Sequence, residues 1–437
     1  MRLAAIAPLV LLPVLVASMP SETGSGVAHV VLALAAILAA AKLGGDLAVR
    51  IGQPAVLGEL VAGVILGNLD LAGLTWFRAL TADASINMLA QLGVLILLFE
   101  VGLESTVREM MKVGASATLV AVLGVVTPFA LGWGVGALLL PGHSAYAHAF
   151  LGATLTATSV GITARVLKDL GKARLQEARI ILGAAVIDDV LGLVILAVVA
   201  GVIESANQGT TLSYGSTVLV VAKAAVFMVG ALGLGVALSP RLFGVAARLR
   251  GHGVLLATAL VLCFVLAWLA SAVGLAPIVG AYAAGLILED IHWKEFTSRG
   301  ERSVGELVQP VASFLVPVFF VLMGMRVQVQ SFAHPAGLGL ALLLTLAAIA
   351  GKQACALGAL GSGMDRLSIG LGMIPRGEVG LIFASIGLGL TLHGERIVDE
   401  GIYSAVVIMV IVTTLVTPPA LKWSLERGAH RAAERSG

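Results

Sequence analysis

Charged residues are scarce in this chain. Only 12% of its 437 residues are Asp, Glu, Lys or Arg, whereas 59% are hydrophobic, and the mean hydropathy is +1.03. A soluble domain carries roughly 25% charged residues, so the composition excludes an ordinary soluble protein and indicates a polytopic membrane protein. The apolar runs also lack the alternating polarity of β-barrel strands, which leaves an all-α fold.

Cysteines, nucleotide-binding loops and basic runs are rare or missing as well. Cys263 and Cys355 both lie in apolar runs without a second Cys or a His at ligand spacing, so we expect neither a disulfide framework nor a metal site built on cysteine. No GxxxxGK[ST] loop occurs, which argues against an ATP-driven pump. The net charge is +2 and no basic run favours a nucleic-acid partner. We expect no enzymatic activity and no cofactor.

Long apolar runs dominate the sequence and give fourteen candidate membrane spans. They lie at about 3–20, 27–49, 54–68, 84–104, 115–140, 147–168, 178–203, 214–239, 253–272, 274–290, 307–327, 336–361, 367–392 and 401–425. Two of them, 54–68 and 274–290, are short, which predicts tilt or incomplete crossing. Run 3–20 is either an extra span or a cleaved signal sequence, and we favour the span. The expected fold is an all-α polytopic membrane protein with 13–14 transmembrane helices.

Basic residues alternate between the two sides of these spans. With the N-terminus inside, the inner loops and ends hold 20 of the 27 Lys and Arg residues, whereas the outer loops hold only Arg78, Arg326 and Arg396. Basic residues concentrate on the cytosolic side of membrane proteins, so this asymmetry supports both the span count and a cytosolic C-terminus.

An internal repeat relates the two halves of the chain. A shift of 222 residues places Gly58, Ala62, Gly63, Ile65 and Leu66 on Gly280, Ala284, Gly285, Ile287 and Leu288, and Gly102 on Gly324. Seven spans separate the copies, so they would cross the membrane in opposite directions. Such inverted repeats build the midplane site of secondary transporters. We expect two five-helix repeats, 54–203 and 274–425, with spans 27–49, 214–239 and 253–272 as extra or linking helices.

Two adjacent carboxylates, Asp188 and Asp189, lie near the centre of span 178–203. At 1.5 Å per residue they are about 15 Å from the basic end at Arg179, close to the bilayer midplane. A charge at this depth costs at least ~2.5–3.5 kcal/mol, so it requires a partner, water or a bound cation. The alternative is a protonated Asp that is only hydrogen-bonded to a neighbouring helix, but a pair of acids favours a functional site.

Two lysines also lie within spans. Lys352 is about fourteen residues from Arg366, again near the midplane, and the aspartate pair is its obvious counter-charge. The alternative, a lysine that snorkels to the interface, is hard to reach from the middle of a span. Lys223 lies closer to a span end, can snorkel more readily, and is interpreted as structural or unexplained.

Two segments predict interrupted helices at the same depth. The stretch 152–167 contains Thr154, Thr156, Thr158 and Ser159, which favour an unwound helix whose oxygens ligate a small cation, although packing by small polar residues is the alternative. In 372–385, Pro375 and Gly377 predict a second break. Arg376 and Glu378 flank this break, where they either compensate the half-helix dipoles or pair with each other.

These side chains suit ion exchange. Successive helical residues point about 100° apart, so one aspartate can meet Lys352 while the other lines an ion pathway. Carboxylate, hydroxyl and carbonyl oxygens together form a site for Na⁺ or a similar cation, and a proton competes for the same carboxylate. Glu59 is a fourth intramembrane acid, for which an interdomain hydrogen bond is as good an explanation as a transport role.

Together, these motifs resemble the monovalent cation:proton antiporters, in particular the CPA2 branch. The motifs that carry the resemblance are QPAVLGELVAGVILG (53–67), LLFEVGLE (97–104), TATSVGITARVL (156–167), the IDD of 187–189, PVFFVLMGM (317–325), GKQACALG (351–358) and PRGEVGLIFA (375–384). The resemblance extends over nearly all of 27–425. The potassium-efflux branch usually has a nucleotide-binding domain and lacks the acidic pair, so the chain departs from that branch.

The resemblance implies a six-helix core, formed by the last three spans of each repeat, that moves as an elevator beside a dimerisation domain. It implies that Asp189 is the main ion- and proton-carrying carboxylate, that Asp188 pairs with Lys352, and that exchange is electrogenic. The corresponding domains are 1–26 (extra span or signal-like segment), 27–114 (dimerisation and scaffold), 115–203 (core, first half), 204–335 (linking and dimerisation), 336–425 (core, second half) and 426–437 (cytosolic tail).

We therefore expect a dimeric Na⁺ (or Li⁺)/H⁺ antiporter of the inner membrane that serves pH homeostasis. Asp188 and Asp189 would hold Na⁺ or H⁺, with Lys352, Thr158 and Ser159 beside them. The supporting residues would be Glu378, Arg376, Glu59 and Thr156. The alternatives are K⁺/H⁺ exchange on the same scaffold, a channel-like or ligand-sensing membrane protein, and a sodium-coupled organic-anion symporter, against which the buried lysine argues.

Overall fold

The computed structural model describes most of the chain after residue 25. It describes residues 26–103, 107–208, 214–249, 251, 253–273, 275, 277–288, 302–327, 329–330, 335–361, 363–377, 379–380, 383–384, 387, 391–392 and 395–436. The predicted span 3–20 and the side chain of Lys223 lie outside this part.

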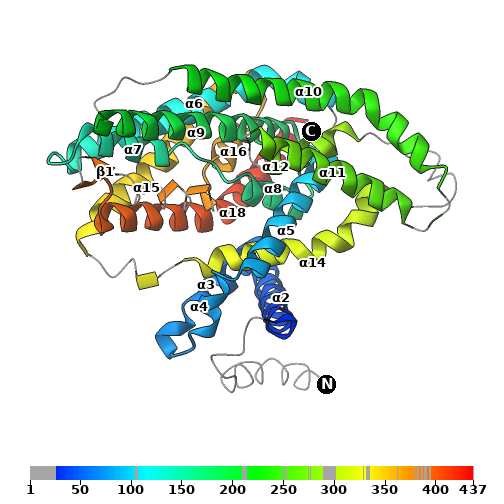
Figure 1. The fold of residues 1–437 in the computed structure, drawn as a ribbon, viewed down its shortest axis with the longest axis horizontal. Helices are drawn as coiled ribbons and strands as arrows, with labels where there is room; N and C mark the ends of the chain where they lie inside the picture. Colours follow the sequence, from blue (N-terminus) through cyan, green and yellow to red (C-terminus); the bar gives the residue numbers. More distant parts are fainter. Residues whose placement is uncertain are drawn as a thin grey trace. The chain divides into compact units, whose positions relative to one another are not determined.

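The described chain is almost entirely helical (Figure 1). Its α-helices are α2 (Val27–Arg50), α3 (Ala55–Gly67), α4 (Trp76–Leu80), α5 (Ala84–Leu103), α6 (Val107–Leu139), α7 (Ala145–Thr154), α8 (Val160–Asp169), α9 (Gln176–Gln208), α10 (Tyr214–Ala246), α11 (Val254–Ala272), α12 (Pro277–Ile287), α14 (Val304–Met325), α15 (Pro335–Cys355), α16 (Arg366–Gly372) and α18 (Glu400–Ser436). The 3₁₀ turns η1 (Leu69–Ala72) and η4 (Ala356–Gly358) and the paired two-residue strands β1 (Thr391–Leu392) and β2 (Glu395–Arg396) complete it.

The helices follow the predicted apolar runs. Seven helices in the described ranges are long and apolar enough to cross a membrane, and α3 and α12 are shorter apolar helices. The all-α membrane fold is thereby confirmed, whereas the count of 13–14 spans stays a prediction.

Three boundaries differ from the sequence interpretation. Helix α6 begins at Val107 rather than near residue 115, and α18 continues to Ser436 through the expected tail 426–437. The reason is that hydropathy delimits the part of a helix inside the bilayer, whereas polar residues extend the helix into the interface. The predicted span 367–392 ends differently, because Thr391 and Leu392 pair with β2 instead of continuing a helix.

The chain forms two compact units. Unit 1 comprises residues 1–96 and 311–329, and unit 2 comprises residues 97–310 and 330–437. The domain boundaries expected from the resemblance stay a prediction.

Glycines let the helix backbones touch in unit 1. A Cβ added at Gly58 of α3 would meet the backbone of Gly44 in α2, and one at Gly63 would lie 2.9 Å from the Cα of Gly324 in α14. Any side chain at these positions would push the helices apart, as is typical of small residues at membrane-helix interfaces.

The same contacts recur in unit 2 at the predicted offset of 222 residues. Gly280 of α12 meets the backbone of Leu266 in α11, and Gly285 approaches the Cα of Gly102 in α5. These contacts support the repeat and also relate α2 to α11, two helices outside the expected five-helix repeats. The inverted orientation of the two copies stays a prediction.

Helix α6 of unit 2 packs against α7, α9 and α15. Helix α15 in turn lies beside α18 (Figure 1). The helices that carry the predicted site residues of 152–189 and 352–378 therefore all belong to this unit.

Candidate functional site

The first predicted break lies between α7, which ends at Thr154, and α8, which begins at Val160. The hydroxyls of Thr154 and Thr156 each donate a 2.8 Å hydrogen bond to a backbone carbonyl three residues earlier in the chain. Such local bonds compete with regular helical bonding, which accounts for the interruption at this sequence. The predicted unwound segment is therefore present in the structure.

The second break follows α16, which ends at Gly372. Pro375 has no N–H group to continue a helix, and Gly377 has φ of +49°, a left-handed conformation that favours glycine. A Cβ at Gly377 would also lie 2.5 Å from Oγ of Ser159. Glycine is thus required at this position by both the backbone and the available space.

Direct hydrogen bonds join the two breaks. The N–H of Ser159 donates to the carbonyl of Pro375 at 2.7 Å, and the Thr158 hydroxyl donates to the carbonyl of Met373 at 3.3 Å. One turn into α8, the Thr163 hydroxyl donates to the carbonyl of Gly372 at 2.6 Å. The interrupted segments therefore cross in contact, with each satisfying backbone groups of the other.

A fully buried ion pair lies at this crossing. Nζ of Lys352 in α15 is 3.1 Å from Oδ2 of Asp188 in α9, and both side chains have 0% exposure. The same ammonium donates a 2.7 Å hydrogen bond to the carbonyl of Thr156 in the first break. The structure thus brings Lys352 together with Asp188, one of the two aspartates expected at the midplane.

The second oxygen of Asp188 is less well satisfied. Oδ1 is buried and makes no hydrogen bond within the described ranges, although Thr158 lies beside the carboxylate. A buried carboxylate oxygen without a donor is costly, and a bound cation or proton would relieve that cost. The side chain of Asp189 lies outside the described part of the structure, so its role stays a prediction.

A second buried cation, Arg376 of the second break, bonds the backbone of the first break and of α15. Its guanidinium donates to the carbonyl of Ala157 at 2.5 Å and to the carbonyl of Ala348 in α15 at 3.4 Å. A cation placed near the carbonyl end of α7 would compensate that half-helix dipole, which is one of the two predicted roles and stays a prediction. The other role, an ion pair with Glu378, falls on a residue outside the described ranges.

Glu59 lies in unit 1, on α3, where it is 2% exposed and packs near Gly45 of α2. It is not among the residues of unit 2 that meet at the crossing, and its proposed contribution stays a prediction.

The structure also shows two contacts that the sequence analysis did not predict. Glu100 of α5 is buried and pairs with Lys168 at the end of α8. The signal was present in the sequence, since Glu100 is an acid inside a predicted span. The hydroxyl of Thr127 in α6 donates to the carbonyl of Gly351 at 2.8 Å, a contact to backbone that has no sequence signature.

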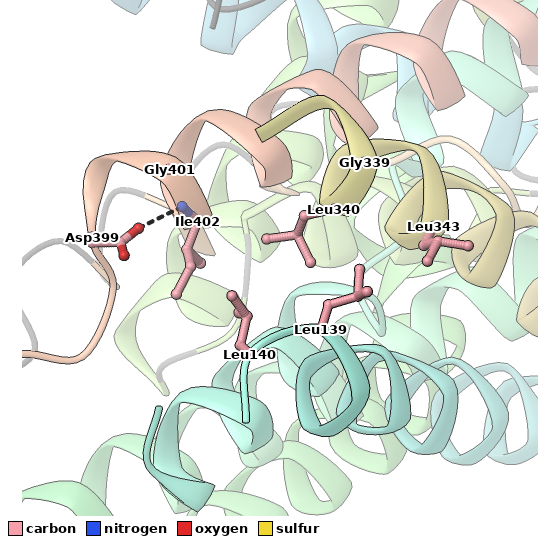
Figure 2. Close-up of a pocket in the computed structure, with 8 residues that line it drawn as sticks. All are labelled: Leu139, Leu140, Gly339, Leu340, Leu343, Asp399, Gly401 and Ile402. Carbon is pink, nitrogen blue, oxygen red and sulfur yellow. Dashed lines mark hydrogen bonds between the residues drawn. The ribbon is translucent and has the colours of Figure 1, made fainter. Parts of the chain in front are cut away.

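A recess of about 430 Å³ lies at the end of α6 and the start of α18 (Figure 2). Leucines 139, 140, 340 and 343 line it together with Ile402, and Asp399 stands at its edge. Asp399 accepts a 2.7 Å hydrogen bond from the N–H of Ile402 and lies 3.3 Å from the ring of His143. None of the predicted site residues lines this recess.

Within the described residues, no group of three or more His, Cys, Asp or Glu side chains could hold a metal ion. The oxygens described at the crossing belong to a carboxylate, hydroxyls and backbone carbonyls, which are hard ligands.

The fold and the crossing define an integral membrane transporter with a charged site between two interrupted helices. The family model described as "Sodium/hydrogen exchanger, transmembrane" matches residues 29–427. The chain therefore belongs to the sodium/hydrogen exchanger family, a family of transporters, and the resemblance seen in the motifs is confirmed.

Individual relatives support this family assignment. The high-affinity Na⁺/H⁺ antiporter NhaS3 of Synechocystis is 39% identical over 429 residues, which cover 90% of this chain and 89% of that protein. The Na⁺/H⁺-K⁺ antiporter GerN of Bacillus cereus is 35% identical, covering 90% of this chain and 95% of that protein. A solved structure of the sodium proton antiporter MjNhaP1 from Methanocaldococcus jannaschii has the same fold, with a TM-score of 0.65 at 17% identity over 93% of this chain and 98% of that one.

Proposed function

We propose that this protein exchanges Na⁺ or Li⁺ for H⁺ across the membrane. The observation that carries the proposal is the buried Asp188–Lys352 pair beside the crossing of the two breaks. The relatives that are named as Na⁺/H⁺ antiporters support the choice of ions.

The geometry allows a cation and the ammonium of Lys352 to compete for Asp188. In the structure Oδ2 is occupied by the ammonium, while Oδ1 is buried without a hydrogen bond and lies near Thr158. A Na⁺ ion at Asp188 and Asp189, with hydroxyl oxygens of Thr158 and Ser159 nearby, would weaken the ion pair by repelling the lysine. A proton on Asp189 would release the Na⁺ ion, so the two ions would be bound in turn.

We further propose that the core moves as an elevator, that exchange is electrogenic, and that the protein is a homodimer in the inner membrane with its C-terminus in the cytosol. These proposals rest on the resemblance and on the distribution of basic residues. Movement of the crossing as one body is consistent with the hydrogen bonds between Thr158, Ser159 and the second break.

Potassium–proton exchange is the second candidate. One relative is named as a Na⁺/H⁺-K⁺ antiporter. A channel-like or sensing role is a third candidate. Coupling of flux to the proton gradient separates it from the other two.

The test uses proteoliposomes with purified protein and an imposed pH gradient. Na⁺, Li⁺ and K⁺ are added in turn, with the membrane potential either clamped or free. Dissipation of the gradient by Na⁺ or Li⁺, with a rate that depends on the clamp, supports the proposal. Dissipation by K⁺ alone supports the second candidate, and no response to any cation overturns cation/proton exchange.

A further inference from the structure

Gly124 of α6 is a buried-helix glycine that close backbone packing does not explain. At Gly58, Gly63 and Gly280, an added Cβ would collide with the backbone of a neighbouring helix. At Gly124, the nearest atoms to an added Cβ are Nζ of Lys352 at 3.4 Å and Cβ of Cys355 at 3.5 Å, which are ordinary van der Waals distances. Alanine would therefore fit, although glycine is a poor helix former.

The space at Gly124 is thus a methyl-sized space beside the ammonium of Lys352. Nζ donates to Thr156 and to Asp188, which accounts for two of its three N–H groups, and no third acceptor is present among the described residues. The ammonium therefore has free space on the side of Gly124, whereas its two acceptors, Thr156 and Asp188, lie on other sides.

Helices α6 and α15 pack closely beside this space. Three residues along α6, the Thr127 hydroxyl lies 2.8 Å from the carbonyl of Gly351 and 2.5 Å from the carbonyl of Leu123 in its own helix, so its single proton is shared between them. A Cβ at Gly351 would lie 2.8 Å from the Cα of Pro128, so the two backbones are in contact next to Lys352.

We propose that Gly124 is a positioning residue that leaves room for the Lys352 ammonium to withdraw when a cation takes its place at Asp188. This inference rests on the proposed function. Two positive charges at one carboxylate repel each other strongly in a water-poor site. A withdrawal of the ammonium toward Gly124 would lower that repulsion and so would set the apparent affinity for the cation.

The substitution Gly124→Ala tests the proposal because it fills the space without a clash. The methyl group would hold the ammonium near Asp188, so we expect the cation concentration for half-maximal exchange to rise about three- to tenfold. Gly124→Ser fills the same space but offers an acceptor to the ammonium, so its rise should be smaller. Gly134→Ala, on the same helix with open space around it, is the matched control and should behave as the wild type.

The dependence on charge is tested in a Lys352→Ala background. If the Lys352→Ala protein still exchanges, Gly124→Ala should not change its exchange. If it does not exchange, Gly124→Ala should not change the Na⁺-dependent rise in Tm, which reports cation binding. An equal effect of Gly124→Ala with and without the lysine would show a merely structural role and overturn the inference.

Three other results would overturn the inference about Gly124. A Gly124→Ala protein with wild-type cation dependence, or one that fails to fold, would overturn the inference while leaving the proposed function intact. A wild-type protein without cation/proton exchange would overturn the proposed function itself, and the inference with it.

Discussion

Lys352 and Asp188 form an ion pair of 3.1 Å in which neither side chain has any exposed surface. Removal of one partner from such a pair leaves an uncompensated buried charge, which typically costs ~3–5 kcal/mol. Replacement of both partners costs less, because no charge is left behind.

We therefore expect Lys352→Met to lower the Tm of the purified protein, and Asp188→Asn in the same chain to restore part of it. Lys112→Met, at an exposed position of α6, is the control and should leave Tm nearly unchanged. If the changes in Tm caused by Asp188→Asn and by Lys352→Met simply add in the double variant, the ion pair does not stabilise the crossing.

The left-handed Gly377 gives a second prediction. Gly377→Ala should abolish most exchange and lower stability, because it strains the backbone by ~1–2 kcal/mol and also brings Cβ against Ser159. Gly363 has φ of +90° in open space, so Gly363→Ala carries the backbone strain alone. The Tm and exchange rate of the two variants are compared, and an equal loss in both would mean that the contact with Ser159 is unimportant.

The Glu100–Lys168 pair should respond asymmetrically to mutation. Its lysine side chain is 27% exposed, whereas its carboxylate side chain is only 6% exposed. Lys168→Met removes the ammonium from a buried carboxylate and should destabilise the protein more than Glu100→Gln, which leaves a lysine that water can reach. Thermal unfolding of the two variants decides this, and the reverse order would show that packing at Glu100 outweighs its charge.

Charge movement gives a fourth prediction, which concerns Asp188 alone. The resemblance implies that Asn at this position goes with electroneutral exchange, so Asp188→Asn should retain some exchange but lose its dependence on membrane potential. Exchange rates are measured with the potential clamped at several values. An unchanged dependence on potential would show that Asp188 does not take part in charge coupling.

The ion pair at the crossing could be predicted because the surrounding sequence is apolar. Within such runs every charge is conspicuous, and a charge at the midplane must have a partner, so Lys352 could be matched to the pair Asp188 and Asp189. Which of the two aspartates meets the lysine followed only from the resemblance. The two breaks could be predicted for a similar reason, since Pro375 and the hydroxyls of 154–159 oppose regular helix.

Other parts of the site could not be predicted. The acceptors of Arg376 and Thr127 are backbone carbonyls, which every residue carries, so no sequence pattern reports them. The space at Gly124 depends on which atoms of α15 face it. A glycine can occur in a helix for several structural reasons, so its presence in the sequence does not reveal this space. The polar ends of α6 and α18 were missed because hydropathy does not report where a helix ends outside the bilayer.

The most direct test of the central claim compares the wild type with Asp189→Asn in proteoliposomes. Equal amounts of each protein are reconstituted, a pH gradient is imposed, and Na⁺ is added while the internal pH is recorded; Gly134→Ala serves as the reconstitution control. We predict that Na⁺ dissipates the gradient through the wild-type and control proteins and not through Asp189→Asn, because the exchanged ions then lack their common carboxylate. Exchange by Asp189→Asn at the wild-type rate would contradict the account.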